Sequence, residues 1–316
     1  MLDTFGRSIS YMRMSVTELC DLRCRYCMPE HGVCKRERSD MLTEEEMLLA
    51  VRAAASLGVK KLRITGGEPL VKKNIVSICS QAAEIPGIEE VCITTNGQLL
   101  PGYAHELREA GVKRVNLSLD THDVKKYAYI TRRGTLSGAM AGLRAALCAG
   151  FERVKINTVL IGGFNDDEIE QIASLTQKYP VDVRFIELMP MYDGGEFGPE
   201  AYIPDSVVLE RVPQFEMIGT DGVARQYALP GAMGSVGLIS PVSSHFCAEC
   251  NRIRLTADGH IKPCLHSETE LSVKGLGYDE MAEQFKRAIL AKPGGHAELS
   301  ARSRSRAGRN MNEIGG

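Results

Sequence analysis

The feature that most limits the possible folds is the alternation of strand-like and helix-like segments in the first two-thirds of the chain. Six short β-rich segments occur at residues 13–17, 61–67, 90–97, 114–120, 153–161 and 181–189. Helical periodicity fills the gaps, and the helix predicted after Thr43 opens with a Thr-x-x-Glu capping box and ends at Gly58. Strands that alternate with helices predict βαβ units and therefore a parallel sheet.

The residue types at the strand ends distinguish between the two common parallel-sheet folds. Polar residues or glycines end nearly every predicted strand, at Thr17, Thr65–Glu68, Thr94–Gly97, Ser118–Asp120, Asn157 and Glu187. An open doubly wound sheet concentrates functional residues at one switch point, whereas a barrel spreads them over all its C-terminal strand ends. We therefore expect an α/β fold, an incomplete (βα)6 TIM-type barrel, with a partly β C-terminal region that closes its open side.

The composition changes after about Met191 and divides the chain into three parts. A Gly/Pro-rich loop and a more β-like region follow the alternating part, and the final residues are rich in Ser, Arg and Gly without an apolar face. We expect a barrel domain at residues 1–225, a second-cysteine-group and substrate-binding region at 226–300, and a mobile tail at 301–316.

Charge and hydropathy exclude several classes of protein. The formal net charge of −2 gives no global reason for nucleic-acid or membrane binding, and no segment has the length of a signal peptide or a membrane span. We therefore expect a cytoplasmic protein whose ten cysteines are ligands or catalysts more often than disulfide partners. Cys79, Cys92 and Cys148 lie in apolar periodic segments and are expected to be buried. Cys34, in a charged loop, is ambiguous.

Two groups of three cysteines are the strongest chemical signal. Cys20, Cys24 and Cys27 follow the first strand, and Cys247, Cys250 and Cys264 form the second group. Three thiolates suit a cubane iron–sulfur cluster with one open iron, which in the second group would be free to bind substrate. The alternative is zinc, with a fourth ligand from His31 in the first group or from His245, His260 or His266 in the second.

Positively charged residues lie within the predicted strands, where apolar residues are expected. They are Arg13, Arg63, Lys155 and Arg184, together with Arg252 and Arg254 at alternate positions after Cys250. Arg184 has the opposite parity to Glu187, so it needs a bulge or a register change to face the same way. Carboxylate pairing or exposure explains any single cation, but the set favours a strongly anionic ligand, and arginine suits phosphate.

The segment "GGEP" at Gly66–Pro69 ends the second strand, where two glycines let the backbone approach a ligand closely. Together with the first cysteine group, it makes the chain resemble the radical S-adenosylmethionine (SAM) superfamily. In that superfamily GGEP binds the methionine amino group, and the amino and carboxylate groups of SAM chelate the open iron. The resemblance implies reductive cleavage of SAM to a 5′-deoxyadenosyl radical.

Motifs over nearly the whole chain narrow the resemblance. The segments "TTNG", "NLSLDT", "RFIELMP" and "CNRIRLTADGHIKPCL", and the terminal Gly315–Gly316, are similar to those of the radical SAM GTP 3′,8-cyclases, the molybdenum cofactor biosynthesis protein A family. This implies a lyase with two 4Fe–4S clusters and SAM as cofactors and GTP as substrate. The radical would take the ribose 3′ hydrogen, and C3′ would attack guanine C8. The product would be (8S)-3′,8-cyclo-7,8-dihydroguanosine 5′-triphosphate, in the first step of molybdopterin biosynthesis.

The resemblance also assigns roles to individual residues. Cys20, Cys24 and Cys27 would hold the SAM-binding cluster, and Cys247, Cys250 and Cys264 the substrate-binding auxiliary cluster. The implied SAM contacts are Tyr26, Gly67, Ser118 and Met189, and the implied GTP contacts are Arg13, Arg63, Thr94, Lys155, Arg252, Ile253 and Arg254. Secondary candidates are Glu68, Asn157, Arg184, Gly315 and Gly316, the last two as a tail that enters the barrel and supports radical formation.

The implied partners are a low-potential electron donor of the flavodoxin or ferredoxin type and a downstream cyclic pyranopterin monophosphate synthase. No nucleic-acid or membrane partner is expected, and a homodimer is compatible with the resemblance. A radical SAM peptide or protein maturase remains an alternative, but it would normally carry a longer cysteine-rich C-terminal domain. A double-zinc scaffold or nucleic-acid module leaves GGEP unexplained. A second hypothesis for the terminal diglycine is that it is activated as a thiocarboxylate or conjugated.

Overall fold

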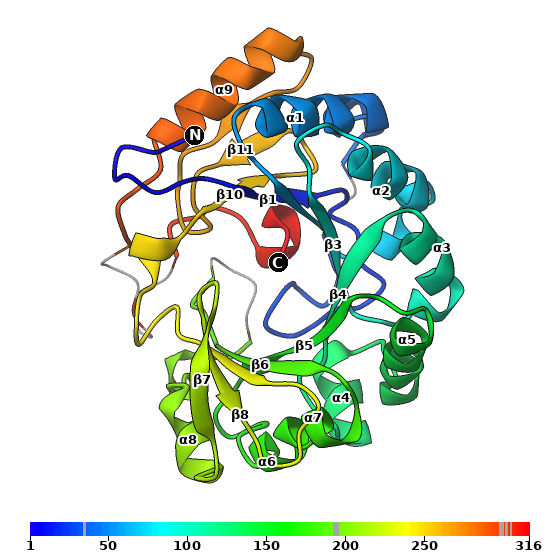
Figure 1. The fold of residues 1–316 in the computed structure, drawn as a ribbon, viewed down its shortest axis with the longest axis vertical. Coiled ribbons are helices and arrows are strands. Elements are labelled where there is room, and N and C mark those ends of the chain that lie inside the picture. Colours follow the sequence, from blue (N-terminus) through cyan, green and yellow to red (C-terminus); the bar gives the residue numbers. More distant parts are fainter. Residues whose placement is uncertain (34–35, 192–195, 297–299, 301–302, 304) are drawn as a thin grey trace.

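The computed structural model describes residues 1–33, 36–191, 196–296, 300, 303 and 305–316, so Cys34 lies outside the described residues. The described strands form a single sheet with the order β12-β11-β10-β1-β2-β3-β4-β5-β6-β9-β8-β7. Figure 1 shows this sheet curved around a central space, with helices along its outer side and the C-terminus inside the curve.

Six parallel strands form the middle of the sheet, at the places that the sequence predicts. They are β1 (Tyr11–Ser15), β2 (Lys61–Thr65), β3 (Glu90–Thr95), β4 (Val112–Ser118), β5 (Arg153–Leu160) and β6 (Asp182–Glu187). Each strand runs parallel to the next in the chain. The predicted α/β fold, an incomplete TIM-type barrel, is confirmed.

The helices between these strands cover the outer side of the sheet. They are α1 (Glu44–Ser56), α2 (Ile75–Ala83), α3 (Ala104–Glu109), α4 (Val124–Thr131), α5 (Leu136–Cys148), α6 (Ile169–Ala173) and α7 (Leu175–Lys178). The predicted capping box begins α1: the Thr43 hydroxyl accepts from the Glu46 amide, and the Glu46 carboxylate accepts from the Thr43 amide. The helical pattern at residues 166–179 forms two short helices that meet at Ser174.

The burial of the scattered cysteines differs from the prediction at one position. Cys79 and Cys92 are buried, but Cys148 is exposed. Cys148 is the last residue of α5 and lies two positions after the buried Ala146, about 200° around the helix axis. The prediction that Cys148 is buried is therefore wrong.

The last third of the chain adds strands to both sides of the six-stranded core. β9 (Val236–Ile239) pairs in parallel with β6, and β10 (Arg252–Leu255) pairs in parallel with β1. Antiparallel strands extend the sheet further on each side: β8 (Ala224–Ala228) and β7 (Glu216–Asp221) beside β9, and β11 (His260–Lys262) and β12 (Leu271–Ser272) beside β10. The boundaries at residues 225 and 300 stay predictions, and β8 crosses the first of them.

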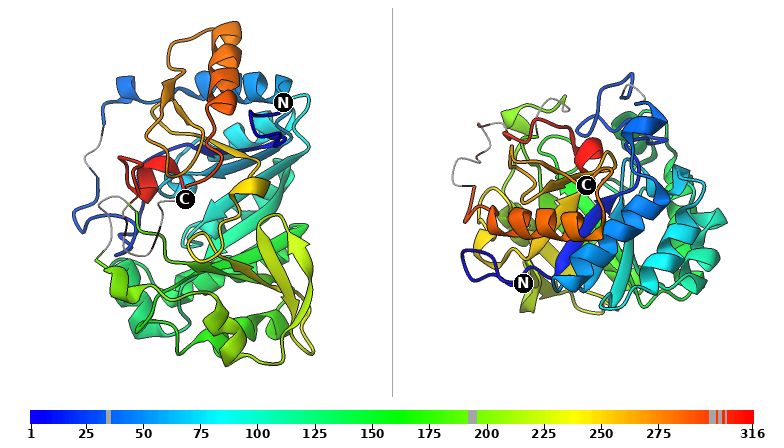
Figure 2. Two further views of the ribbon diagram at one scale, coloured as in Figure 1. Left: turned by 90° about the vertical axis from the view of Figure 1, so that its left-hand side faces the viewer. Right: turned by 90° about the horizontal axis from the view of Figure 1, so that it is seen from above.

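The described residues of this part of the chain also form the α-helices α8 (Ser206–Arg211), α9 (Tyr278–Leu290) and α10 (Met311–Ile314). α9 lies beside α1, and α10 lies inside the curve of the sheet (Figures 1 and 2). Ile314 is fully buried, so the prediction of a tail without an apolar face is wrong for this stretch. The mobility expected for the tail stays a prediction.

The two faces of the central strands differ in chemistry. Met12, Met14, Leu62, Ile64 and Ile93 are fully buried in the apolar core that also includes the helices. The alternate positions carry the predicted strand cations, because side chains alternate between the faces with a period of two. The interior of the curve is therefore the polar, charged face of the sheet.

No described helix has the length and apolar character that a membrane span requires.

Candidate functional site

One cavity inside the curve of the sheet brings the two cysteine groups together. Its lining includes all six thiols: Cys20, Cys24, Cys27, Cys247, Cys250 and Cys264. Predicted strand-end residues lie between the two groups, among them Thr65–Glu68, Thr94, Ser118, Asn157 and the post-strand Met189. The structure thus gathers residues from both ends of the chain around one space.

The two glycines of GGEP make room for the first cysteine loop. The Gly67 amide donates to Thr17 O at 2.7 Å, and the Glu68 amide donates to Leu19 O at 2.8 Å. A Cβ on Gly67 would lie 2.4 Å from Leu19 O, and a Cβ on Gly66 would lie 2.7 Å from Thr17 O. The sequence predicts glycines that approach a ligand, and in the structure they also approach the backbone that leads into Cys20.

Glu68 binds the neighbouring strand end instead of projecting freely into the cavity. Its carboxylate accepts from the Leu70 amide at 3.1 Å, the Thr95 hydroxyl at 2.8 Å and the Asn96 amide at 2.8 Å. Burial raises the pKa of Glu68 to about 7 despite these hydrogen bonds. Asn96 in turn donates to Asp21 at 2.7 Å, so Glu68 connects the β2 and β3 ends to the cysteine loop.

The implied SAM contacts line the same cavity as the first cysteine group. Tyr26, Gly67, Ser118 and Met189 all line it. The Tyr26 hydroxyl donates to Asp120 Oδ2 at 2.8 Å, and burial raises the pKa of Asp120 to about 6. The ring of Tyr26 is therefore fixed beside the thiols by a carboxylate at the end of β4.

The surroundings of the thiols shift their pKa values in different directions, so they stabilise the thiolate form to different degrees. Burial raises the pKa of Cys20 and Cys24 well above the ordinary value, and that of Cys27 to about 12. In the second group the pKa of Cys250 is lowered, because Lys292 and Arg252 outweigh the effect of burial. The second group therefore already contains the positive charge that stabilises a thiolate.

Lys292 is a site residue that the sequence reasoning missed. It is 3% exposed and lines the cavity. Its Nζ donates to Arg252 O at 2.8 Å, to Pro263 O at 2.9 Å and to Cys250 Sγ at 3.5 Å. The sequence shows only a lysine directly before Pro293, and the fold is needed to show that it is buried and reaches the cysteines.

The histidines offered as zinc ligands have other surroundings. His31 is exposed, and His260 pairs with Asp258 at 3.3 Å. His245 and His266 each make an edge contact with the ring of His296, with centroid distances of 4.7 and 4.9 Å. Within the described residues, no three His, Cys, Asp or Glu side chains converge on a single metal position. The ligands of one zinc ion must converge on one position, whereas the thiolates of a cubane cluster each bind a separate iron.

Arginines surround Tyr11, a second residue that the sequence reasoning missed. Arg63 Nε donates to the Tyr11 hydroxyl at 2.5 Å, and the guanidinium carbons of Arg13, Arg63 and Arg252 each lie 5.9 Å from its ring centroid. Burial acts to raise the pKa of Tyr11, but these three arginines lower it to about 7. Arg63 also donates to Thr94 at 3.4 Å, so two implied GTP contacts touch each other.

We call Arg13, Arg63, Arg252 and Arg254 the cationic cluster. It has too few carboxylates to balance its positive charge. Within the described part of the chain, no carboxylate forms an ion pair with Arg13, Arg63, Arg252 or Arg254. Arg13 Nε is buried without a hydrogen-bond partner. Burial and neighbouring arginines lower the pKa of Arg252 to about 10 and that of Arg254 to about 9. An uncompensated buried cluster of this kind fits a polyanionic ligand.

Arg184, Glu187 and Ile253 have surroundings that the sequence pattern does not show. Arg184 faces the inside in a regular β5–β6 register opposite Asn157, so the bulge or register change expected for it is absent from these described strands. Glu187 is the residue that differs, because it accepts from the amides of Val242 and Ser243 at 2.9 Å each. Ile253 is fully buried in the apolar core, so its predicted GTP contact stays a proposal for its backbone.

The C-terminal residues line the cavity and contact both Cys27 and Arg254. Met311, Asn312 and Gly316 line it, and the Asn312 amide donates to the Cys27 sulfur. Arg254 Nη1 donates to Gly315 O. Gly315 has φ +85°, and a Cβ there would lie 2.4 Å from Thr65 Oγ1. The tail therefore contacts a thiol of the first cysteine group and an arginine of the cationic cluster.

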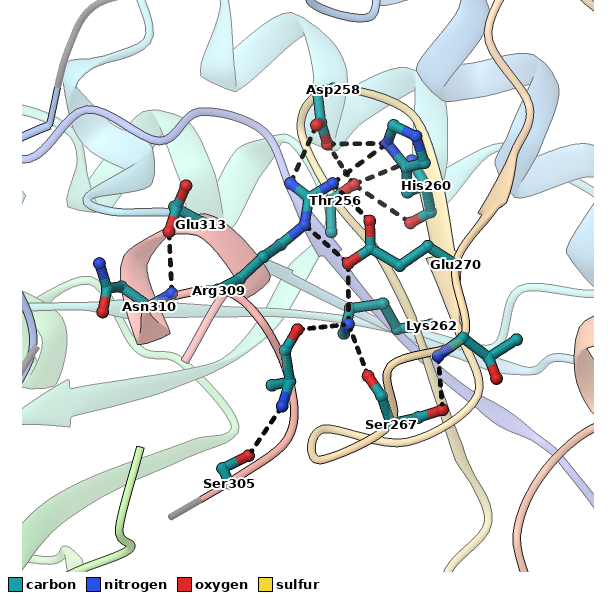
Figure 3. Close-up of polar contacts among 12 residues, drawn as sticks. Thr256, Asp258, His260, Lys262, Ser267, Glu270, Ser305, Arg309, Asn310 and Glu313 are labelled. Carbon is teal, nitrogen blue, oxygen red and sulfur yellow. Dashed lines mark hydrogen bonds and ion pairs between the residues drawn. The ribbon is translucent and has the colours of Figure 1, made fainter. Parts of the chain in front are cut away.

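A network of ion pairs fixes this tail to the second half of the sheet (Figure 3). Arg309 donates to Glu270 at 2.6 and 2.7 Å and to Asp258 at 2.9 Å. Lys262, fully buried, donates to Glu270 at 2.8 Å and to Ala307 O at 3.2 Å. Arg36 pairs with Asp258 at 2.5 Å and with Glu313 at 3.4 Å. We call Arg36, Asp258, Lys262, Glu270 and Arg309 the tail clamp.

Replacing Arg309 with methionine is expected to detach the tail without unfolding the barrel. The change removes charged hydrogen bonds that contribute about 1–3 kcal/mol, so the detached population rises by about 5- to 150-fold. Hydrogen exchange at the amides of residues 305–316 should accelerate. The exposed Arg52 on α1, also replaced by methionine, is the control. Unchanged exchange in the Arg309 variant would show that the clamp does not hold the tail.

The comparisons with known proteins agree with this geometry. Residues 14–176 match the family model "Radical SAM superfamily", and residues 181–298 match "Molybdenum Cofactor Synthesis C". A GTP 3′,8-cyclase of Alkaliphilus oremlandii is 46% identical over 321 residues, with all of both chains covered, and one of Moorella thermoacetica is 45% identical over 327 residues with the same coverage. The chain belongs to the GTP 3′,8-cyclase family of radical SAM proteins.

Solved structures show the same fold at low sequence identity. Streptococcus suis SuiB has a TM-score of 0.64 and 16% identity, over 87% of this chain and 66% of SuiB. The AdoMet-bound anSMEcpe has a TM-score of 0.56 and 13% identity, over 92% of this chain and 82% of that one. Membership in the superfamily implies a 4Fe–4S cluster and SAM.

Proposed function

We propose that this protein is a GTP 3′,8-cyclase that catalyses the first step of molybdenum cofactor biosynthesis. The observation that carries the proposal is the shared cavity, which both three-cysteine groups line together with Arg13, Arg252 and Arg254, arginines that form no ion pair with a carboxylate of the described residues. The curated relatives that are similar over the full length have this activity in their names.

Cys20, Cys24 and Cys27 would hold the SAM-binding cluster, beside Tyr26, Gly67, Ser118 and Met189 as SAM contacts. Bound there, the cluster and SAM supply one-electron reduction and a radical that abstracts hydrogen. The chain contributes orientation: Asp120 fixes Tyr26, and Glu68 connects the β2 and β3 ends to the cysteine loop. Asp120 and Glu68 are buried, so their side chains exclude water where they lie.

Cys247, Cys250 and Cys264 would hold a second 4Fe–4S cluster and bind the guanine. Support comes from the position of all three thiols on the shared cavity, the buried Lys292 at Cys250 and the position of Arg252 directly after this loop. Lys292 donates to sulfur and to two carbonyls, so it fixes the loop while adding positive charge. Charge of this kind and hydrogen bonds to the ligand sulfurs are general means by which a protein tunes an iron–sulfur cluster.

The cationic cluster would bind the triphosphate between the two cysteine groups. Arg13, Arg63, Arg252 and Arg254 are on β1, β2 and β10, with Thr94 on β3 and Lys155 on β5. Multiple strands fix these donors, so the ribose is held in one orientation relative to SAM. Orientation of two bound reactants can contribute about 7–11 kcal/mol to lowering a barrier.

The proposal includes partners and location. A donor of the flavodoxin or ferredoxin type would supply electrons, and a cyclic pyranopterin monophosphate synthase would receive the product. The protein would act in the cytoplasm, where reduced thiols are maintained. The activities in the relatives' names support the substrate, while the two partner proteins follow from the chemistry that the reaction needs.

Anaerobic purification followed by incubation with GTP, SAM and dithionite tests the function. We expect brown protein with roughly eight iron atoms per chain, 5′-deoxyadenosine and cyclised guanosine triphosphate. Deoxyadenosine without cyclised nucleotide would favour a peptide or protein maturase. Colourless protein that contains zinc and does not cleave SAM would contradict both enzyme functions.

A further inference from the structure

The β7–β8 turn places a carboxylate on cations of β5 and β6 from outside the barrel core. Asp221 is the last residue of β7, and Gly222, with φ +62°, follows it in the turn. Asp221 Oδ2 accepts from Lys155 Nζ and from Arg184 Nη2, the latter at 2.7 Å, and lies 3.7 Å from Arg153 Nη1. A single carboxylate oxygen therefore pairs with cations of both β5 and β6.

The cations of this pair are buried, whereas the carboxylate remains accessible. The side chain of Lys155 is 3% exposed and that of Arg184 is 15% exposed, but Asp221 is 32% exposed. Burial, together with Arg184, lowers the pKa of Lys155 to about 8. Buried cations need an anion to be stable, and Asp221 provides one from a hairpin at the edge of the sheet.

The pairing with Asp221 leaves hydrogen-bonding capacity unused. Arg184 Nε is buried without a partner, as is Arg13 Nε. Burial and the nearby Arg63 lower the pKa of Arg184, while Asp221 acts in the opposite direction. Asp182, at 3.5 Å, also pairs with Lys155. These cations can therefore accept a larger anion with more oxygen atoms than one carboxylate offers.

We propose that Asp221 is a built-in counter-ion that takes the place of a phosphate group in the nucleotide-free protein, and that the distal phosphates of the nucleoside triphosphate displace it from Lys155 and Arg184. The inference rests on the proposed function for the presence of the triphosphate. A ligand must be long enough to reach β5 and β6 to displace Asp221. A nucleoside monophosphate held near β10 leaves the Asp221 pairs intact.

The proposal and a purely structural role of Asp221 predict different changes in the affinity for phosphate chains when Asp221 is replaced. If Asp221 competes with phosphate, replacing it with asparagine removes the competitor and tightens binding of long phosphate chains. If the pairs only attach the hairpin to the barrel, the same replacement loosens the hairpin and brings no gain in affinity. Affinity for ligands of different phosphate length therefore separates the two roles.

The test is calorimetric titration of the anaerobic holoprotein with GTP, inorganic tripolyphosphate and GMP, without and with Mg²⁺. For Asp221→Asn we expect roughly tenfold tighter binding of GTP and tripolyphosphate than in the wild type, with GMP unchanged. Glu216→Gln removes the same charge from an exposed position of β7 and should leave all three affinities unchanged.

Unchanged or weaker binding of tripolyphosphate by Asp221→Asn would overturn the inference. Weaker binding only with Mg²⁺ would also overturn it, because Asp221 would then act as a metal ligand. A wild-type protein that binds neither GTP nor tripolyphosphate would contradict the proposed function itself. If the wild type binds both and the variant gains nothing, only the role of Asp221 fails.

A measurement on the wild type covers the case in which the variant does not fold. Displacement of Asp221 should release the β7–β8 turn, so hydrogen exchange at the amides of residues 219–224 should accelerate when tripolyphosphate binds. GMP should not have this effect. Slower or unchanged exchange with tripolyphosphate would mean that Asp221 stays on its cations, and would overturn the inference.

Discussion

Replacing Cys250 with alanine is expected to separate the two halves of the reaction. The variant should still cleave SAM to 5′-deoxyadenosine, because Cys20, Cys24 and Cys27 are intact. Cyclised nucleotide should fall by more than about 100-fold, since the guanine loses its anchor and misplacement by about 1 Å has an effect of this size. Chromatography of both products under anaerobic conditions measures the separation.

Matched variants make this result specific. Cys24→Ala should stop both products, because it removes a thiolate of the SAM-binding group. Cys148→Ala removes an exposed thiol at the end of α5 and should change neither. Iron content should fall by about half in each of the first two variants, since each removes one of two clusters. Cyclisation at the wild-type rate by the Cys250 variant would show that the second group does not hold the substrate.

Deletion of Gly315 and Gly316 is expected to abolish cyclisation and to leave cluster assembly intact. The deletion removes the carbonyl that accepts from Arg254 and the residue that lines the cavity at the chain end. Neither glycine is a cysteine-group residue, so iron content should equal that of the wild type. The measurements are iron content, 5′-deoxyadenosine and cyclised nucleotide in the same sample.

A single substitution tests the geometry of the tail without shortening the chain. Gly315→Ala forces a side chain into the left-handed region and toward Thr65 Oγ1, so it should lower cyclisation in the same direction as the deletion. Met311→Leu keeps an apolar residue of similar volume and serves as the control. Full activity in the deletion variant would rule out a role for the tail in the reaction.

The strands and the two cysteine groups were predictable because their signals are local. Period-two patterns and capping residues identify β1–β6 and α1, and the spacing of the cysteines shows two three-thiol groups. Strand parity also placed Arg13, Arg63 and Lys155 on one face, where the structure has them. These features depend on a few neighbouring residues, so one sequence is sufficient.

The residues that the sequence did not reveal depend on contacts between distant segments. Asp221 meets Lys155 across 66 residues, and Lys292 meets Cys250 across 42. Tyr11 looked like an ordinary strand residue until the fold placed three arginines around it. The packed tail was missed for the same reason, since Arg309 gains its carboxylate partners only from the folded β10–β12 region.

The position of β10 beside β1 has a consequence for how the protein is made. The side chains of Asn251 and Ser10 are hydrogen bonded across 241 residues, so β1 has no partner on this side until almost the whole chain has left the ribosome. Contacts so far apart in sequence form slowly, and an unpaired strand edge attracts other chains. Arg252 and Arg254 arrive on the strand that covers this edge. Protection from aggregation and completion of the anion site are therefore the same late folding event.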